Sequence, residues 1–154
     1  MLTQEEIFEI EAEFDRYERK QAACIEALKT VQRHRGWVSD QSLSDLAAFL
    51  EMTAEELDAV ATFYSLIFRK PVGRHVILVC TSLSCWVMGH EQVLQQLCER
   101  LKIGFGETTA DGRFTLLPVV CLGACDRAPA VMIDNDLHGN LDSEKIDKIL
   151  AEYQ

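Results

Sequence analysis

Four cysteines stand in two close pairs, and each pair directly follows a run of apolar residues. The first pair is Cys80 and Cys85, a Cys-x4-Cys spacing, and the second pair is Cys121 and Cys125, a Cys-x3-Cys spacing. The apolar runs are typical of buried strands, so the four thiols can converge where two strands end. Such a set can bind zinc, hold an iron–sulfur cluster or form disulfides.

The spacings favour an iron–sulfur cluster among these chemistries. Structural zinc uses pairs about two to four residues apart, which suits the second pair, whereas the first pair is slightly long. A thioredoxin-type dithiol has the spacing Cys-x-x-Cys, which neither pair has. Plant-type ferredoxins also begin with Cys-x4-Cys. The loops add hydrogen-bond donors for sulfur, with hydroxyls at Thr81, Ser82 and Ser84 and an accessible backbone at Gly123. Zinc and free or oxidised thiols remain open alternatives.

The other reactive side chains do not form a second constellation. Cys24 and Cys98 lie on apolar helical stripes, so we expect them to pack as small hydrophobic side chains. The four histidines are scattered and predict no acid–base pair: His34, His75, His90 and His138. The chain has no glycine-rich dinucleotide fingerprint and no P-loop, so we expect no NADH or flavin site in this chain alone.

The composition limits which partners and which cellular compartment are expected for the chain. The chain has 154 residues, of which 26% are charged, and a net charge of −10. Such a surface argues against nucleic acid or an anionic membrane as a partner. The apolar runs are too short for a membrane span. The start, Met1 to Glu6, is acidic and has no basic segment, so we expect no signal or transit peptide and a cytoplasmic location.

Helical periodicity dominates the first part of the chain. A capping box of Thr3 and Glu6 opens a charged helix on a surface or a partner, and a second box begins at Thr53. The predicted helices of this bundle span residues 3–20, 21–34, 40–50 and 54–64. An aromatic cluster follows, made of Phe63, Tyr64, Ile67 and Phe68. We expect it to pack in the core, and the alternative is a docking surface for a partner.

The spacing of the apolar residues changes after Pro71 and Gly73. These two residues mark a boundary between two predicted domains, 1–70 and 71–154. The second domain is predicted to have strands at 75–79, 113–120 and 129–133, a short fourth strand near 135–140, and helices at 89–101 and after Asp142 or Ser143. A strand–helix–strand order implies a parallel pair, to which later strands can add antiparallel. The predicted fold class is α/β, with an N-terminal helical bundle followed by a thioredoxin-like domain with a mixed sheet. Pro118, near the end of its strand, predicts that this strand lies at an edge of the sheet or leaves the sheet there.

The cysteine motifs resemble those of a known family. The Cys80-x4-Cys85 pair and the segment 121–129, Cys-Leu-Gly-Ala-Cys-Asp-Arg-Ala-Pro, closely resemble the thioredoxin-like [2Fe–2S] ferredoxin subunit of respiratory complex I. This is the E subunit of bacterial NADH:quinone oxidoreductase. The resemblance covers nearly the whole chain and includes segments 25–29, 35–38, 60–64, 71–75 and 111–118.

The resemblance implies a site, a cofactor and partners. It implies that Cys80, Cys85, Cys121 and Cys125 ligate one [2Fe–2S] cluster and that the chain transfers single electrons within this oxidoreductase and translocase of the respiratory chain. The implied partners are the subunit that binds FMN and NADH and the other subunits of the peripheral arm. The implied location is the cytoplasmic face of the inner membrane. The resemblance implies neither nucleic-acid binding nor direct insertion into the membrane. The alternatives are a homologous diaphorase subunit of an NAD-linked hydrogenase or formate dehydrogenase, a zinc-stabilised interaction protein, and a thiol oxidoreductase.

Overall fold

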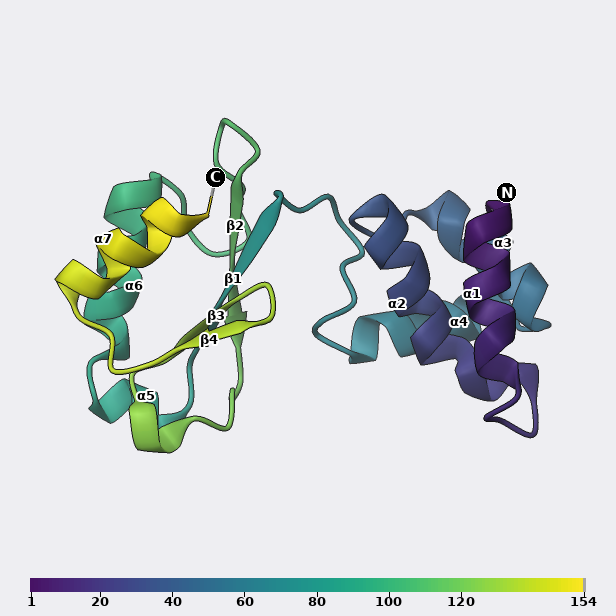
Figure 1. The fold of residues 1–154 in the computed structure, drawn as a ribbon, viewed down its shortest axis with the longest axis horizontal. Helices are drawn as coiled ribbons and strands as arrows, with labels where there is room; N and C mark the ends of the chain where they lie inside the picture. The colour runs from purple at the N-terminus through teal and green to yellow at the C-terminus, as the bar shows by residue number, and fades with distance from the viewer. Residues whose placement is uncertain (154) are drawn as a thin grey trace. The chain divides into compact units, whose positions relative to one another are not determined.

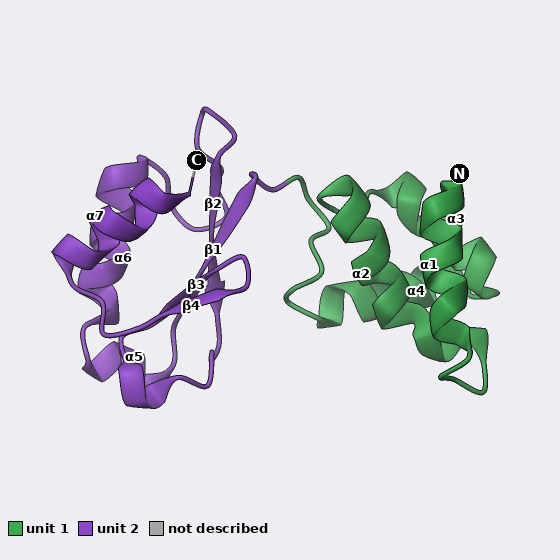
Figure 2. Cartoon of the chain, in the orientation of Figure 1, with its two compact units in different colours: residues 1–71 green, residues 72–154 purple. Residues whose placement is uncertain are grey.

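The computed structural model describes residues 1–153 as seven α-helices, two short 3-10 helices and a four-stranded sheet (Figure 1). Its contacts divide the chain into two compact units, Met1–Pro71 and Val72–Gln154 (Figure 2). That each unit is a separate domain stays a prediction from the sequence. No helix among residues 1–153 is both long and apolar enough to cross a membrane.

The first unit is helical. It contains α1 (Gln4–Phe14), the 3-10 helix η1 (Lys20–Ala23), α2 (Cys24–Arg35), α3 (Asp40–Leu50) and α4 (Ala54–Phe63). Both predicted capping boxes are confirmed, since the Thr3 and Thr53 hydroxyls accept the N–H groups of Glu6 and Glu56. The helices pack around a core of fully buried side chains from all four α-helices: Ile10, Leu28, Val31, Leu46, Leu50 and Leu57.

The first helix is shorter than predicted and is not confined to a surface. It ends at Phe14, and residues 15–19 form turns and bends before η1. The charge pattern of residues 16–20 suited a helix, but these residues offer little apolar surface to bury, and helices gain most of their stability from such burial. Within α1, Ile10 is fully buried and Glu6 is buried as well.

The prediction that the aromatic cluster packs in the core is wrong. Phe63 is 81% exposed and Tyr64 is also exposed, whereas Ile67 alone is buried. The pair stands where α4 ends, with Phe63 as its last residue and Tyr64 as its C-cap, and the Phe63 ring is left exposed there. The two rings contact each other edge to face, with 5.2 Å between centroids.

The second unit is a mixed sheet with helices. It contains β1 (His75–Cys80), α5 (Leu83–Val87), α6 (His90–Leu101), β2 (Phe114–Val119), the 3-10 helix η2 (Cys125–Arg127), β3 (Val131–Ile133), β4 (Asp136–His138) and α7 (Ser143–Glu152). The strand order is β2-β1-β3-β4. The predicted parallel pair is confirmed for β1 with β2, and both β3 pairings are antiparallel. Pro118 lies on the edge strand β2, as its missing N–H requires.

One face of this sheet is covered by α6 and α7, which lie side by side in Figure 1. Their apolar residues, Val93, Leu97 and Ile146, pack against alternate strand residues such as Ile77 and Val79. This core holds β1 and β2 rigidly, and both strands lead into the cysteine loops.

Candidate functional site

The two cysteine loops leave the same edge of the sheet. Cys80 is the last residue of β1, and it stands opposite Val119, the last residue of the parallel strand β2. The Thr81 N–H donates to the Val119 carbonyl at 2.9 Å and continues the pairing into the loops. Cys121 and Cys125 follow directly after β2. Parallel pairing is therefore what brings the two loops together.

A short helix that the sequence analysis missed places the second cysteine. Helix α5 begins after Ser82, and Cys85 is its third residue and is buried. Five residues are too few for helical periodicity to be recognised in a window. One pattern in the sequence could have predicted this helix. Leu83, Trp86 and Val87 are spaced at i, i+3 and i+4, which is typical of one face of a helix.

Three of the four cysteines influence one another's ionisation. The neighbouring thiols of Cys85 and Cys121 help to lower the pKa of Cys80. Burial opposes ionisation of Cys80, but the N–H groups of Ser82 and Leu122 donate to its sulfur and also lower its pKa. Burial raises the pKa of Cys85 to about 11, and the neighbouring Cys80 adds to this. The pair thus holds one sulfur in the thiolate-favouring environment that a metal ligand requires.

The fourth cysteine lies at the outer side of this group. Cys125 is the first residue of η2, and an electrostatic interaction with it contributes to the raised pKa of Cys85. Cys80 and Cys85 are buried beside three small residues, Ala124, Ala128 and Ala130, whereas Cys121 and Cys125 are exposed. The site therefore has a buried side and a side that faces solvent.

Backbone N–H groups point at these sulfurs. The Gly123 N–H donates to Cys121 Sγ at 3.3 Å, and the Ala130 N–H donates to Cys85. Gly123 has a φ of +72°, a left-handed conformation that favours glycine. Amide donors around cysteine sulfurs are a feature of iron–sulfur sites, where they tune the potential. The donor set therefore fits a thiolate-bound cluster.

Residues 1–153 contain no group of three His, Cys, Asp or Glu side chains placed to hold one metal ion. A [2Fe–2S] cluster makes a different demand, since each of its two irons takes two protein thiolates.

A second loop supports the turn that contains Cys125. The Asn140 N–H donates to the Arg127 carbonyl at 2.6 Å, and the Leu141 N–H donates to the Pro129 carbonyl. Gly139 passes so close that an added Cβ would lie 2.5 Å from Arg127 Cβ and 2.7 Å from its carbonyl oxygen. The absence of a side chain at Gly139 thus allows the segment after β4 to pack closely against η2.

Cys24, Cys98 and His75 have contacts that are structural. Cys24 and Cys98 are partly buried and each packs against the core of its own unit, where burial raises the pKa of both thiols. His75 Nδ1 lies 2.7 Å from Asp134 Oδ2. In the described part of the chain, neither the Cys24 thiol nor the Cys98 thiol lies with the cysteines of the two loops.

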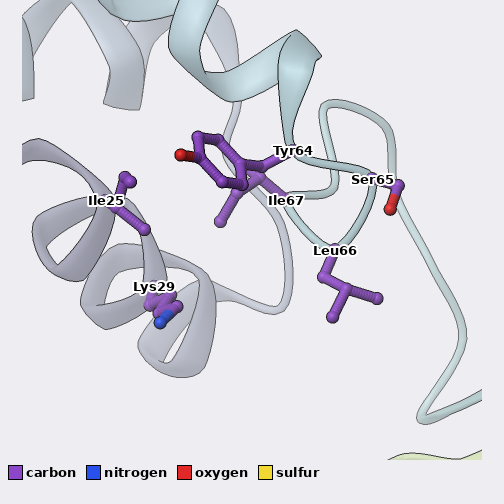
Figure 3. Close-up of a pocket in the computed structure, with 6 residues that line it drawn as sticks. All are labelled: Ile25, Lys29, Tyr64, Ser65, Leu66 and Ile67. Carbon is purple, nitrogen blue, oxygen red and sulfur yellow. The ribbon is translucent and has the colours of Figure 1, made fainter. Parts of the chain in front are cut away.

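The first unit has a shallow apolar pocket of about 350 Å³. Ile25 and Lys29 of α2 form one wall, and the segment 64–67 after α4 forms the other (Figure 3). Among the described residues, its lining offers no thiol, carboxylate or imidazole. The cysteine loops are therefore the better candidate for chemistry.

A mixed sheet of this order, with two cysteine pairs beyond the ends of its parallel strands, defines a thioredoxin-like protein with a candidate cysteine site. The chain belongs to the thioredoxin-like [2Fe-2S] ferredoxin family, whose model matches residues 10–154.

Relatives and a solved structure agree with this family. The chain is 52% identical to the E subunit of NADH-quinone oxidoreductase from Pseudomonas aeruginosa, over 99% of this chain and 92% of the relative. It is 50% identical to the protein of the same name from Escherichia coli K12, over 94% of this chain and 87% of the relative. An NAD+-reducing [NiFe]-hydrogenase in the air-oxidised state matches 82% of this chain, with a TM-score of 0.71 and 28% identity. That match spans only 22% of the hydrogenase chain.

Proposed function

We propose that this chain transfers single electrons on one [2Fe–2S] cluster, as the E subunit of an NADH:quinone oxidoreductase. The observation that supports it best is the group of cysteines beyond β1 and β2, with backbone N–H groups donating to their sulfurs. The family and its E-subunit relatives point to the same function.

The proposed ligands are Cys80, Cys85, Cys121 and Cys125. When bound, such a cluster accepts and releases one electron. The residues around it have three tasks. Parallel pairing of β1 and β2 aligns the two loops, the small alanines exclude water from Cys80 and Cys85, and the N–H groups stabilise negative charge on sulfur.

The proposed partners supply the remaining chemistry. A second subunit binds NADH and FMN, and hydride transfer belongs to that flavin. Other subunits of the peripheral arm complete the assembly at the cytoplasmic face of the inner membrane. This assignment is supported by the relatives, which are named as subunits of an NADH-quinone oxidoreductase.

A second candidate is a diaphorase subunit of an NAD-linked hydrogenase. The match to the NAD+-reducing [NiFe]-hydrogenase favours it, although identity to the E-subunit relatives is far higher. Purification of the native complex separates the two, because a hydrogenase would contain nickel and oxidise H₂, whereas the proposed complex would reduce quinone.

The purified chain tests the cofactor. We expect a reddish protein with about two irons and two acid-labile sulfides, and an S = 1/2 EPR signal after dithionite reduction. The potential should be low, on the order of −400 mV, as for plant-type clusters. A colourless protein that holds about one zinc would overturn electron transfer and support the zinc alternative.

A further inference from the structure

Thr81 is the single residue between the end of β1 and the N-cap of α5. Strand β1 ends at Cys80, and Ser82 is the N-cap of α5. Cys85 is the third residue of that helix. The chain changes from strand to helix at Thr81, so the position of this residue sets where Cys85 lies relative to Cys80. One residue therefore joins the two elements that present the first cysteine pair.

The side chain of Thr81 also joins this loop to the second cysteine loop. Its hydroxyl donates to the Val119 carbonyl at 3.1 Å, and its backbone N–H donates to the same oxygen at 2.9 Å. A carbonyl oxygen has two lone pairs, so one acceptor can take both donors. The N–H bond continues the ladder of the parallel strands, whereas the hydroxyl adds a hydrogen bond that the sheet by itself does not provide.

The acceptor of this hydrogen bond lies at a restrained point of the chain. Val119 is the last residue of β2 and stands two residues before Cys121. Pro118 precedes it, and the proline ring fixes its own φ and so limits rotation of the backbone just before the acceptor. The sheet register pairs Val119 with Cys80. Because the end of β2 is held in this way, the hydroxyl bond restrains Thr81 and the start of α5.

The hydroxyl of Thr81 donates to a carbonyl and not to a sulfur. The sequence suggested this hydroxyl as a donor to cysteine sulfur, but a hydroxyl has one hydrogen, and here it is used on Val119. Thr81 thus acts on the site through the positions of the cysteines. The contact is exposed, so its loss should cost the fold little.

We propose that Thr81 is a positioning residue of the cysteine site. Its hydroxyl fixes the joint between β1 and α5 against the end of β2, and so sets the separation between the first cysteine pair and Cys121. A functional site must be held within about 0.5 Å of its productive geometry by supporting contacts of this kind. The inference rests on the proposed function, because the cluster is the group that both loops would hold.

Three variants of the cluster-loaded chain test the proposal. Thr81→Val keeps the branched side chain and the backbone N–H but removes the hydroxyl, and Thr81→Ser retains a hydroxyl. Thr62→Val is the matched control, since the Thr62 hydroxyl also donates to a backbone carbonyl, that of Asp58 at 2.8 Å within α4. All three should bind about two irons and unfold at temperatures close to that of the wild type, because an exposed hydrogen bond contributes little.

Thr81→Val should change the properties of the cluster and leave its amount unchanged. The EPR signal of the reduced protein should broaden or shift in g value, because the cysteines are held less strictly. An iron chelator should remove the iron about fivefold faster than from the wild type. Thr81→Ser and Thr62→Val should match the wild type in both measurements. A change in g value separates a positioning role from a general loss of stability, which would lower the unfolding temperature instead.

Several results would overturn the inference. A wild-type EPR signal and iron-release rate in Thr81→Val would overturn it alone, as would a Thr81→Ser variant that behaves like Thr81→Val. Equal changes in Thr62→Val would overturn it by assigning the effect to the stability of the fold. A wild-type chain that holds neither iron nor sulfide would overturn the proposed function and the inference together.

Discussion

The Arg35 guanidinium binds both carboxylate oxygens of Glu6, and this pair joins α2 to α1. Arg35 Nε donates to Oε1 and Nη2 donates to Oε2, both at 2.6 Å. Glu6 is fully buried, and its Oε2 also accepts the Thr3 N–H. The hydrogen bonds from Arg35 are the main reason why the pKa of Glu6 falls to about 2. A residue that reads as part of a capping box thus also forms a buried ion pair.

Glu6→Gln should destabilise the folded chain by about 3 kcal/mol at neutral pH, because it leaves Arg35 without its charged partner. The pKa of Glu6 is lowered on folding, so this stabilisation is present above about pH 4.5 and is lost as the pH falls towards 2. Urea unfolding followed by far-UV circular dichroism at several pH values measures the difference between wild type and variant. Glu9→Gln, which breaks the exposed pair with Arg33, is the control and should show a much smaller effect.

Substitutions at the cysteines should divide them into two groups. Cys85→Ser and Cys125→Ser should lose or distort the cluster, because each removes a proposed thiolate ligand. Cys24→Ala and Cys98→Ala should retain the iron and the visible spectrum, at a packing cost of about 1 kcal/mol each. Bleaching by Cys98→Ala together with an intact spectrum for Cys125→Ser would show that the ligand assignment is wrong.

Gly123→Ala should lower the reduction potential of the cluster. An alanine strains the left-handed backbone by roughly 1 kcal/mol, and relief of that strain would turn the N–H away from Cys121 Sγ. A lost donor disfavours the extra negative charge of the reduced state. Gly106→Ala is the matched control, since Gly106 has a similar φ of +82° but no sulfur acceptor. A redox titration monitored by EPR measures both, and equal potentials would contradict a role for this amide.

Gly139→Ala should destabilise the fold by about 1–3 kcal/mol and perturb the cluster spectrum. The new Cβ would meet the backbone of Arg127, two residues after Cys125, and something must shift. Gly104→Ala is the control because its nearest neighbour would be an ordinary 3.6 Å contact with the flexible Glu107 side chain. Thermal unfolding and the visible spectrum test this prediction, which fails if both variants behave like the wild type.

Capping and turn residues in the sequence predicted the helix ends and turns that depend on residues close together in the chain. The side chains of Ser39 and Asp142 cap α3 and α7, and Gly36 ends α2 with a φ of +80°. Gly89 likewise stands just before α6, and the turn residues around β4 bound a short strand. These signals are reliable because a cap or a turn is decided by one or two side chains.

The predictions from the sequence were wrong where contacts between residues far apart in the chain decide the structure. Residues 15–19 had charges that suit a helix but little surface to bury, and Phe63 had an aromatic ring but no neighbouring element to cover it. Helix α5 was missed because its five residues are held by their place between β1 and α6. Periodicity measures what a segment could bury, while burial itself depends on what packs against it.

By itself, the sequence determined the type of site, since the number and spacing of the cysteines favoured a cluster, and the cysteine motifs together with matching segments along the chain pointed to the family. The tertiary structure decided which sulfurs are buried, which backbone amides face them and which side of the site remains open. Cys80 and Cys121 are distant in the chain, and they meet because β1 and β2 pair in parallel with Cys80 beside Val119. Such a register arises from the packing of a whole sheet, and so no local pattern could have specified it.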